Sequence, residues 1–316
     1  MKRLDRILVV VDPTAQAQPA VEKAARLARS SGAVLELFAC DFDPALDVRA
    51  FADTQRLRTL REAFVAELDR FLAGLARDLR AAGLKVETHV RWDNPLHRGI
   101  LRRVRETSPD LVVKDTHYHS ALRRTLLTNT DWSLIRSCPA PLLLVKGEPW
   151  PALPRILAAI DPGHLADKPA ALDHDILDGA TLLAQRLGGE LHVVHAFFPA
   201  ALLAVTTGMA GMPLAGDAAA AAIVEVERRR IEAGLSAILA SHQLPPDRVH
   251  LLQGSASAIL PTAAQSQQAD IVVMGAVSRS RLEEIFIGST AERVLDRIPC
   301  DTLVIKPVEF VTNLPF

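Results

Sequence analysis

The sequence DIVVMGAVS at residues 270–278 is followed, after nine residues, by GST at residues 288–290. The apolar run before Gly275 predicts a buried strand, and the loop that returns to Gly288 opens a predicted helix over residues 291–297. Such a loop can cradle a phosphate, because glycine lets the backbone approach the ligand and a helix start offers free N–H donors. The residues of this candidate phosphate site are Gly275, Ser278, Gly288, Ser289 and Thr290. The alternative for the last three is a helix start capped by a hydroxyl, which needs no ligand.

The chain is an internal duplication. The sequence RILVVVDP at residues 6–13 recurs as RILAAIDP at residues 155–162, and residues 110–146 align with residues 270–306 at a constant offset of 160. In each half short apolar runs alternate with helical segments, which predicts right-handed βαβ crossovers and a parallel sheet. We therefore predict an α/β protein with two tandem doubly wound domains, each built on a five-stranded parallel sheet.

Asp161 is the second candidate ligand residue of the second half. It ends the predicted first strand, whereas Gly275 follows the predicted fourth strand. In a doubly wound sheet of this order the ligand crevice lies outside the C-terminal ends of these two strands. Asp161 could contact ribose hydroxyls or a phosphate-bound Mg²⁺, and the alternative is an Asp-Pro turn with Pro162.

The segment from Gly275 onward, with RIPCDTLVIK at residues 297–306, resembles the C-terminal third of universal stress proteins. The members of that family that bind ATP carry glycine, two residues, glycine, nine residues, and then glycine with serine or threonine. Here Ser278 stands at the second glycine, and serine is the least disruptive replacement there. The resemblance implies that the second half binds ATP or another adenine nucleotide, that Mg²⁺ can accompany it, and that the backbone at Ala196 contacts adenine.

The resemblance covers nearly all of the chain and is to the tandem members of the family. Its further marks are DW at residues 131–132, CPAP at residues 138–141 and PWP at residues 149–151. It implies two domains of the adenine nucleotide alpha hydrolase-like fold, which mimic within one chain the dimer of single-domain members. We place the domains at residues 1–146 and 155–316, with a stiff Pro-rich linker at residues 147–154.

The first half has lost the residues of the phosphate cradle. At the offset of 160, Gly275, Ser278 and Gly288 correspond to Asp115, Tyr118 and Thr128, and Ser289 corresponds to Asn129. A carboxylate at the cradle repels a phosphate, and the new side chains fill the space that glycine leaves. We therefore expect that the first half does not bind ATP and that Asp12 serves as a turn or helix-cap residue.

Two further features remain open. His117 and His119, spaced i, i+2 after the fourth strand of the first half, could reach one zinc ion, and the alternative is a solvated loop. Residues 197–216 carry no charge, but Pro and Gly interrupt them, which excludes a membrane span. This segment is either a loop packed against the other half or a neighbouring copy, or an apolar wall for an acyl or other lipophilic ligand.

Composition narrows the class of protein. The 316 residues suffice for two domains, 49% are hydrophobic, and the net charge of −1 gives no general attraction to nucleic acid. The arginines at positions 98, 102, 103 and 105 are typical of a solvated helix face, and no nucleic-acid partner is expected. Three distant cysteines and the absence of a signal-peptide pattern favour a cytoplasmic protein without disulfides.

Two functions are consistent with these patterns. One is a stress-response protein that binds an adenine nucleotide in its second half and uses its first half as scaffold or partner surface. The other is a tandem protein without nucleotide, which holds an apolar small molecule in the second half or acts through self-association or protein partners. No catalytic set stands out in the sequence, so at most slow ATP hydrolysis is expected.

Overall fold

The computed structural model describes residues 1, 3–46, 54–119, 124–162, 171–199, 217–242, 244–276, 289–307 and 310. The first half forms β1 (Arg6–Val10), α1 (Pro19–Ser31), β2 (Val34–Asp41), α2 (Thr54–Ala81), β3 (Val86–Trp92), α3 (Leu96–Thr107), β4 (Leu111–Asp115), α4 (Asn129–Ser137) and β7 (Leu142–Val145). The second half forms β8 (Arg155–Ala159), α5 (Leu172–Leu187), β9 (Glu190–Phe197), α7 (Asp217–Leu239), β10 (Val249–Gln253), α8 (Ala256–Ser266), β11 (Ile271–Gly275), α9 (Ser289–Leu295) and β12 (Asp301–Ile305).

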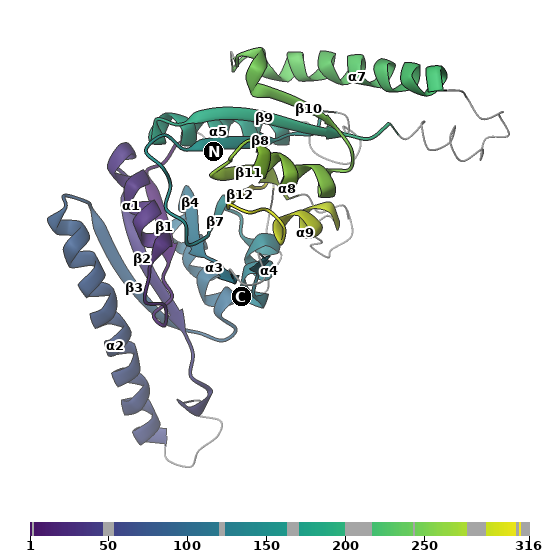
Figure 1. The fold of residues 1–316 in the computed structure, drawn as a ribbon. Coiled ribbons are helices and arrows are strands. Elements are labelled where there is room, and N and C mark those ends of the chain that lie inside the picture. Colours follow the sequence, from purple (N-terminus) through teal and green to yellow (C-terminus); the bar gives the residue numbers. More distant parts are fainter. Residues whose placement is uncertain are drawn as a thin grey trace.

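One ten-stranded sheet runs through the described part of the chain, in the order β10-β9-β8-β11-β12-β7-β4-β1-β2-β3 (Figure 1). Each half contributes five adjacent parallel strands, in which its third, second, first, fourth and fifth strands follow one another. The predicted α/β class and the parallel sheet of each half are therefore confirmed. The two halves meet at the antiparallel pair of β7 with β12, which we call the seam.

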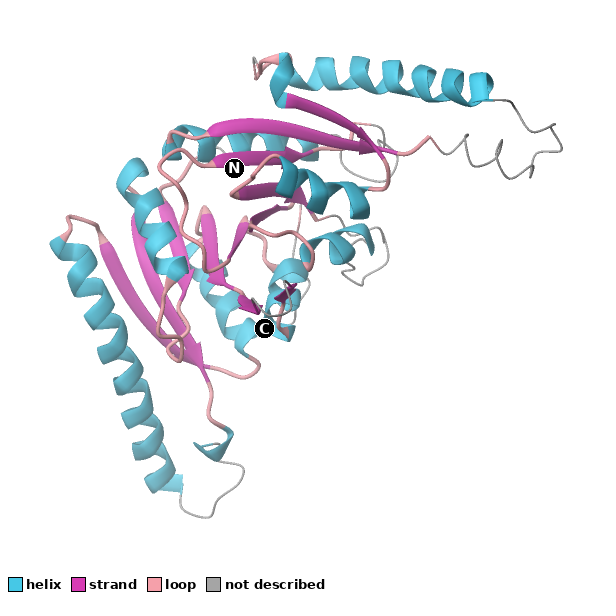
Figure 2. Cartoon of the chain, in the orientation of Figure 1, coloured by secondary structure: helices cyan, strands magenta, loops and turns pink. Residues whose placement is uncertain are grey.

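Helices cover both faces of the sheet, because every central strand is apolar on both sides. In β1 the side chains of Ile7 and Val9 enter one buried cluster, while Leu8 and Val10 enter the other. The first cluster includes residues of α1, α2, α5 and α7, and the second includes residues of α3, α4, α8 and α9. These two helix layers lie on the outer and the inner side of the sheet in Figures 1 and 2. Each core runs across both halves.

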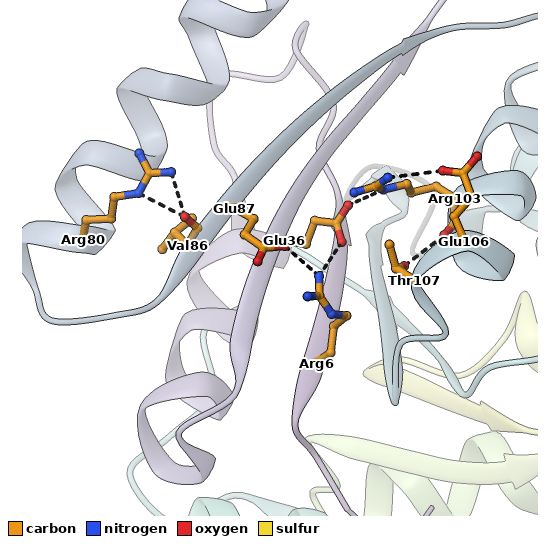
Figure 3. Close-up of polar contacts among 8 residues, drawn as sticks. All are labelled: Arg6, Glu36, Arg80, Val86, Glu87, Arg103, Glu106 and Thr107. Atoms are coloured by element: carbon orange, nitrogen blue, oxygen red, sulfur yellow. Dashed lines mark hydrogen bonds and ion pairs between the residues drawn. The ribbon is translucent and has the colours of Figure 1, made fainter.

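A charged network crosses the first half on the inner face of its sheet (Figure 3). Glu36 on β2 is fully buried and accepts hydrogen bonds from Arg6 on β1, at 3.0 Å, and from Arg103 on α3, at 2.5 Å. Arg102, the preceding residue of α3, pairs with Asp93 at 2.6 Å. Part of the basic character of α3 is therefore neutralised within the half.

The pairing at the seam follows the internal repeat. Leu143 pairs with Leu303, which is its own counterpart at the offset of 160. The two neighbouring pairs are related in the same way. Leu142 pairs with Val304, and their counterparts in the other half, Thr302 and Leu144, form the second pair. Each half therefore pairs through its own fifth strand, and equivalent residues of the two strands make equivalent pairs.

Two lysines at the ends of the seam strands reach across it. Lys146 donates from Nζ to the carbonyl of Ile298, and its counterpart Lys306 donates to the carbonyl of Cys138 at 2.7 Å. Cys138 and Ile298 are themselves counterparts, so the two contacts are reciprocal. Burial lowers the pKa of Lys146 to about 8 and that of Lys306 to about 7. The ring of Phe310 lies 4.1 Å from Lys306 Nζ, an arrangement that favours the cation.

The structure differs from the sequence prediction after β4. The chain forms a short hairpin of β5 (His117–His119) with β6 (Arg124–Leu126), where the sequence suggested an extended loop. Strand propensity explains this, because Tyr118 pairs with Thr125 at its centre. Among the described residues no helix is long and apolar enough to cross a membrane. Most of residues 197–216 lie outside the described residues.

The reciprocal lysines predict an unusual pH dependence of stability. Between pH 7 and 8.5 the folded protein releases protons from Lys146 and Lys306 that the unfolded chain retains, since an unperturbed lysine has a pKa of about 10.4. The free energy of unfolding should therefore rise with pH in this window, by about 1 to 2 kcal/mol. Urea unfolding at pH 7.0, 7.75 and 8.5 measures the rise.

The matched control is the double variant Lys146→Met and Lys306→Met, in which the rise should disappear. The window ends below pH 9 because of the thiols of Cys40 and Cys300, whose pKa burial raises to about 12. Near pH 9 the unfolded chain loses thiol protons that the folded protein keeps, which lowers the free energy of unfolding as pH rises. An equal pH slope in the wild type and in the double variant would contradict the assignment of the slope to these lysines.

Candidate functional site

The C-terminal ends of β8 and β11 lie side by side in the second half. The two strands pair directly, with Ala159 opposite Met274. Gly275 ends β11 and Asp161 follows the end of β8, so both lie at the same edge of the sheet, as the sequence predicted. Strand order alone thus predicts a ligand crevice at this edge of the sheet.

The loop that carries Asp161 is held from two sides by buried side chains. The Asp161 N–H donates to Asp173 Oδ1 at 3.0 Å, and Asp173, in the first turn of α5, is 2% exposed. On the other side, Nδ1 of His195 lies 2.9 Å from the carbonyl of Ile160, which assigns the imidazole proton to Nδ1. The peptide between Ile160 and Asp161 is thereby fixed in position.

The carboxylate of Asp161 is partly accessible to solvent. It is 44% exposed, and Oδ1 lies 3.8 Å from His195 Nδ1, beyond hydrogen-bond distance. A half-exposed carboxylate on a fixed backbone is suited to accept hydrogen bonds from hydroxyl groups or to contact a cation. The geometry is also compatible with the turn role that Pro162 suggests.

Asp173 and His195 were missed as site residues by the sequence analysis. An aspartate in the first turn of a helix is expected for its favourable interaction with the helix dipole, so Asp173 gave no separate signal. His195 lies on β9 directly before Ala196, and its partner carbonyl belongs to Ile160, directly after β8, which only the folded sheet brings near. The one available signal was a histidine at the predicted end of a central strand.

Gly275 has a packing role in this structure. A Cβ at this position would lie 2.9 Å from Leu172 Cδ2 and 3.2 Å from Ile176 Cδ1, both on α5. The glycine therefore lets the start of α5 approach the end of β11. This contact explains the glycine without a ligand, and its predicted phosphate role stays a prediction.

The remaining predicted site residues are only partly described. Ala196 lies near the end of β9, pairs with Leu252 of β10 and is half-buried. Ser289 and Thr290 open α9, but their side chains lie outside the description, as do Ser278 and Gly288 entirely. The side chains of residues 117–119 also lie outside it, so the zinc hypothesis for His117 and His119 stays a prediction.

In the first half a carboxylate stands where the second half has Gly275. Asp115, at the end of β4, accepts a hydrogen bond from the N–H of Ala20 at 2.9 Å, at the N-terminus of α1. Burial raises the pKa of Asp115 to about 6, opposed by that N–H and by the charges of Lys114 and Lys23. Its Oδ2 is buried and has no hydrogen-bond partner among the described residues. The start of α1 is thus occupied by an anion of the chain itself.

A second carboxylate occupies the start of α4. Asp131 is fully buried and forms a capping box with Thr128, which donates to Asp131 Oδ2 from its N–H, at 2.7 Å, and from its hydroxyl. Lys114 Nζ lies 2.8 Å from Asp131 Oδ1. The second half has no charge at any of the three counterparts, Met274, Gly288 and Ala291.

Asp12 also behaves as expected for the first half. Its Oδ1 accepts from the N–H of Thr14 at 2.8 Å and from the Thr14 hydroxyl at 2.6 Å, which is a local Asp turn. The carbonyl of Asp12 accepts from the side chain of Gln18 at 2.7 Å. The interpretation of Asp12 as a turn residue is confirmed, and the loop differs from the one that carries Asp161.

Comparison with known proteins agrees with this duplicated architecture. The sequence pattern of the universal stress protein family matches residues 3–146 and again residues 153–306. The chain belongs to the universal stress protein family. It consists of two tandem domains of this family, as the sequence resemblance implied.

Its relatives include universal stress protein E of Salmonella typhi, which is 29% identical over 99% of this chain and 97% of its own length. The universal stress protein E homologue of Haemophilus influenzae is 24% identical over 96% and 98%. The chain is therefore a tandem universal stress protein of the E type. Among solved structures, a universal stress protein from Pseudomonas aeruginosa has a TM-score of 0.74 and 26% identity, covering 98% of this chain and 95% of its own.

The packing at Gly275 can be tested by substitution. Gly275→Val should lower the free energy of unfolding by about 1–3 kcal/mol, because the new side chain meets Leu172 and Ile176. Gly74→Ala on α2 is the control: a Cβ there meets no atom within 4 Å, and the change should stabilise the helix by about 0.5–1 kcal/mol. Chemical unfolding measures both. A Gly275→Val protein as stable as the wild type would contradict the packing role.

Proposed function

We propose that the second half binds ATP or another adenine nucleotide, with or without Mg²⁺, at the edge of the sheet where β8 and β11 end. In this proposal the first half binds no nucleotide and forms an intramolecular pseudo-dimer with the second. The protein would then act as a cytoplasmic ligand-binding protein of the stress response.

The difference between the two copies is the observation that supports this proposal most. The first half carries its own carboxylates, Asp115 and Asp131, at the starts of α1 and α4. The second half has Gly275 and Ala291 at the equivalent positions. Helix starts attract anions, and at the positions of Gly275 and Ala291 the second half has no carboxylate of its own, although Asp173 lies in the first turn of α5 and Glu292 in that of α9. These two positions are therefore open to an external phosphate.

The roles of the individual residues follow from their places. Asp161, with its half-exposed carboxylate, would accept from ribose hydroxyls or contact Mg²⁺. The backbone at Ala196 would contact adenine, and Gly288, Ser289 and Thr290 would hold phosphates at the start of α9. Ser278 would need the backbone conformation that glycine adopts in the family. No residue is assigned to hydrolysis.

The pseudo-dimer rests on the seam. Equivalent positions of the two halves pair there, and Lys146 and Lys306 reach each other's halves reciprocally. An interface in which the same patch is used on both sides is the arrangement of a two-fold dimer. In this protein the proposed dimer partners are joined by the linker of residues 147–154.

Calorimetric titration with ATP and Mg²⁺ tests the nucleotide site. Gly288→Asp should weaken binding at least tenfold, because a carboxylate would face the phosphates. Asp161→Asn should weaken it by about tenfold through loss of a charged contact, which corresponds to about 1.4 kcal/mol. The matched control is Asp12→Asn in the first half, which keeps an oxygen acceptor for the Thr14 turn and should leave binding unchanged.

Absence of binding in the wild type would refute the nucleotide proposal. Native mass spectrometry of the purified protein would then look for a lipophilic ligand, the alternative function. Residues 200–216, which would form its apolar wall, lie outside the described residues, so that alternative stays a prediction. If Asp12→Asn weakened ATP binding as much as Asp161→Asn does, binding would not be confined to the second half, which would contradict the proposal.

A further inference from the structure

A buried ion pair joins the two halves at one end of the seam. Lys23 on α1 is 5% exposed, and its Nζ lies 2.8 Å from Oδ2 of Asp301, the first residue of β12, which is 3% exposed. The same ammonium donates to the carbonyl of Lys146 at 2.8 Å. This ion pair therefore links the outer helix of the first half to the edge strand of the second.

The carboxylate of Asp301 is saturated by the first half and the linker. Oδ2 also accepts from the indole N–H of Trp150, at 2.8 Å, and Oδ1 accepts from the N–H of Lys146, at 2.8 Å. The ring of Trp150 lies 5.4 Å from Lys23 Nζ. A carboxylate removed from water is stable only with such partners.

The equivalent place at the other end of the seam is uncharged. Helices α1 and α5 end at the equivalent caps Gly32 and Gly188, which sets an offset of 156 and makes Gly179 the counterpart of Lys23. The counterparts of Asp301 and Trp150, at the offset of 160, are Pro141 and Phe310. A Cβ at Gly179 would lie 2.5 Å from Ile305 Cδ1, so any side chain there would have to displace that methyl group.

This asymmetry has a consequence for which surfaces can pair. If two copies of the second half met through β12, Asp301 would lie against Gly179 and Phe310 and would lose both the ammonium and the indole N–H. If two copies of the first half met through β7, Lys23 would lie against Pro141 and would lose its carboxylate. Each mismatch leaves a buried charge unpaired, at both ends of the interface.

The strand pairing and the lysine–carbonyl contacts of the seam do not discriminate in this way. Each half carries both a donor lysine and an acceptor carbonyl, so Lys146 or Lys306 could be satisfied in a pair of identical halves. The strand pairing is equally self-complementary. The further ion pair of Arg136 with Glu292, at 3.3 Å, is nearly half exposed on both sides and contributes little.

We propose that the Lys23–Asp301 ion pair restricts the seam of each half to the other half and excludes a second copy of the same half. The proposal rests on the intramolecular pseudo-dimer. The edge strand of each half could pair with a copy of itself, and Lys23 and Asp301 are the residues that make it specific for the other half.

The test uses the full chain, folded and then cut. A protease recognition sequence inserted at Leu153, which is 69% exposed, allows cleavage of the linker after folding. Native mass spectrometry then reads the composition of the pairs, because the two halves differ in mass. The cut wild type should contain pairs of unlike halves only.

Three variants sharpen the expectation. In Lys23→Met with Asp301→Leu, pairs of identical halves should appear for both halves, because neither meets an unpaired charge. Lys23→Met alone should allow identical pairs of the first half only, and Asp301→Leu alone identical pairs of the second half only. In the control, Arg77→Met with Asp78→Leu, an exposed ion pair of α2 is replaced instead. Its cut chain should contain only pairs of unlike halves. Circular dichroism of each uncut chain verifies folding.

The outcomes separate the two proposals. Unlike pairs only in the double variant, or identical pairs in the cut wild type, would overturn the role of the ion pair and leave the pseudo-dimer standing. Separation of the cut wild type into single halves at micromolar concentration would overturn the pseudo-dimer and the ion-pair role with it. The nucleotide site is tested independently by calorimetry of the uncut chain.

Discussion

The antiparallel pairing of β7 with β12 is the contact on which the rest of the structure depends. Without it each half would expose an edge strand whose residues are almost completely buried here, from Leu142 to Val145 and from Asp301 to Ile305. With it, five parallel strands continue into five more, and both apolar cores run uninterrupted across the junction. The sheet is thus one structural unit although the sequence contains two domains. Cooperative unfolding of both halves follows from this continuity, because neither core is closed without the other half.

A shared scaffold lets the two copies diverge at their ligand edges. The strand order that places Asp161 beside Gly275 also places Asp12 beside Asp115, but the side chains have different tasks. In the first half, Asp115 and Asp131 satisfy the starts of two helices, and Lys114 neutralises one of them. In the second half the same backbone positions carry glycine, alanine and methionine. At these positions internal carboxylates stabilise the first copy, and in our proposal their absence leaves the same positions of the second copy to an external ligand.

Sequence patterns predicted the features that repeat along the chain, but they did not predict contacts that depend on single residues. Apolar runs and the constant offset predicted the class of fold and the sheet of each half, and strand order alone brought Asp161 and Gly275 to one edge. The contacts of Asp173 and His195 with the 160–161 peptide could not be predicted, because Asp173 lies on α5 and His195 on β9, and only the folded structure brings both to this peptide. The packing of Gly275 against α5 likewise depends on the fold. Lys23 and Asp301 are 278 residues apart, and no local pattern marks either as a partner of the other.

The two kinds of contact at the seam differ because of symmetry. A contact that both halves make in the same way must place donor and acceptor on each half, and a backbone carbonyl offers an acceptor whatever the side chain is. The contacts of Lys146 with Ile298 and of Lys306 with Cys138 therefore survive the divergence of Cys138 from Ile298. An ion pair is different, because a cation on one half and an anion on the other cannot be repeated at the opposite end unless each half carries both charges. Lys23 and Asp301 occur once each, so their pair breaks the two-fold relation that the strands and lysines keep. Symmetric contacts can hold two similar surfaces together, but only an asymmetric one can make them distinguish self from partner.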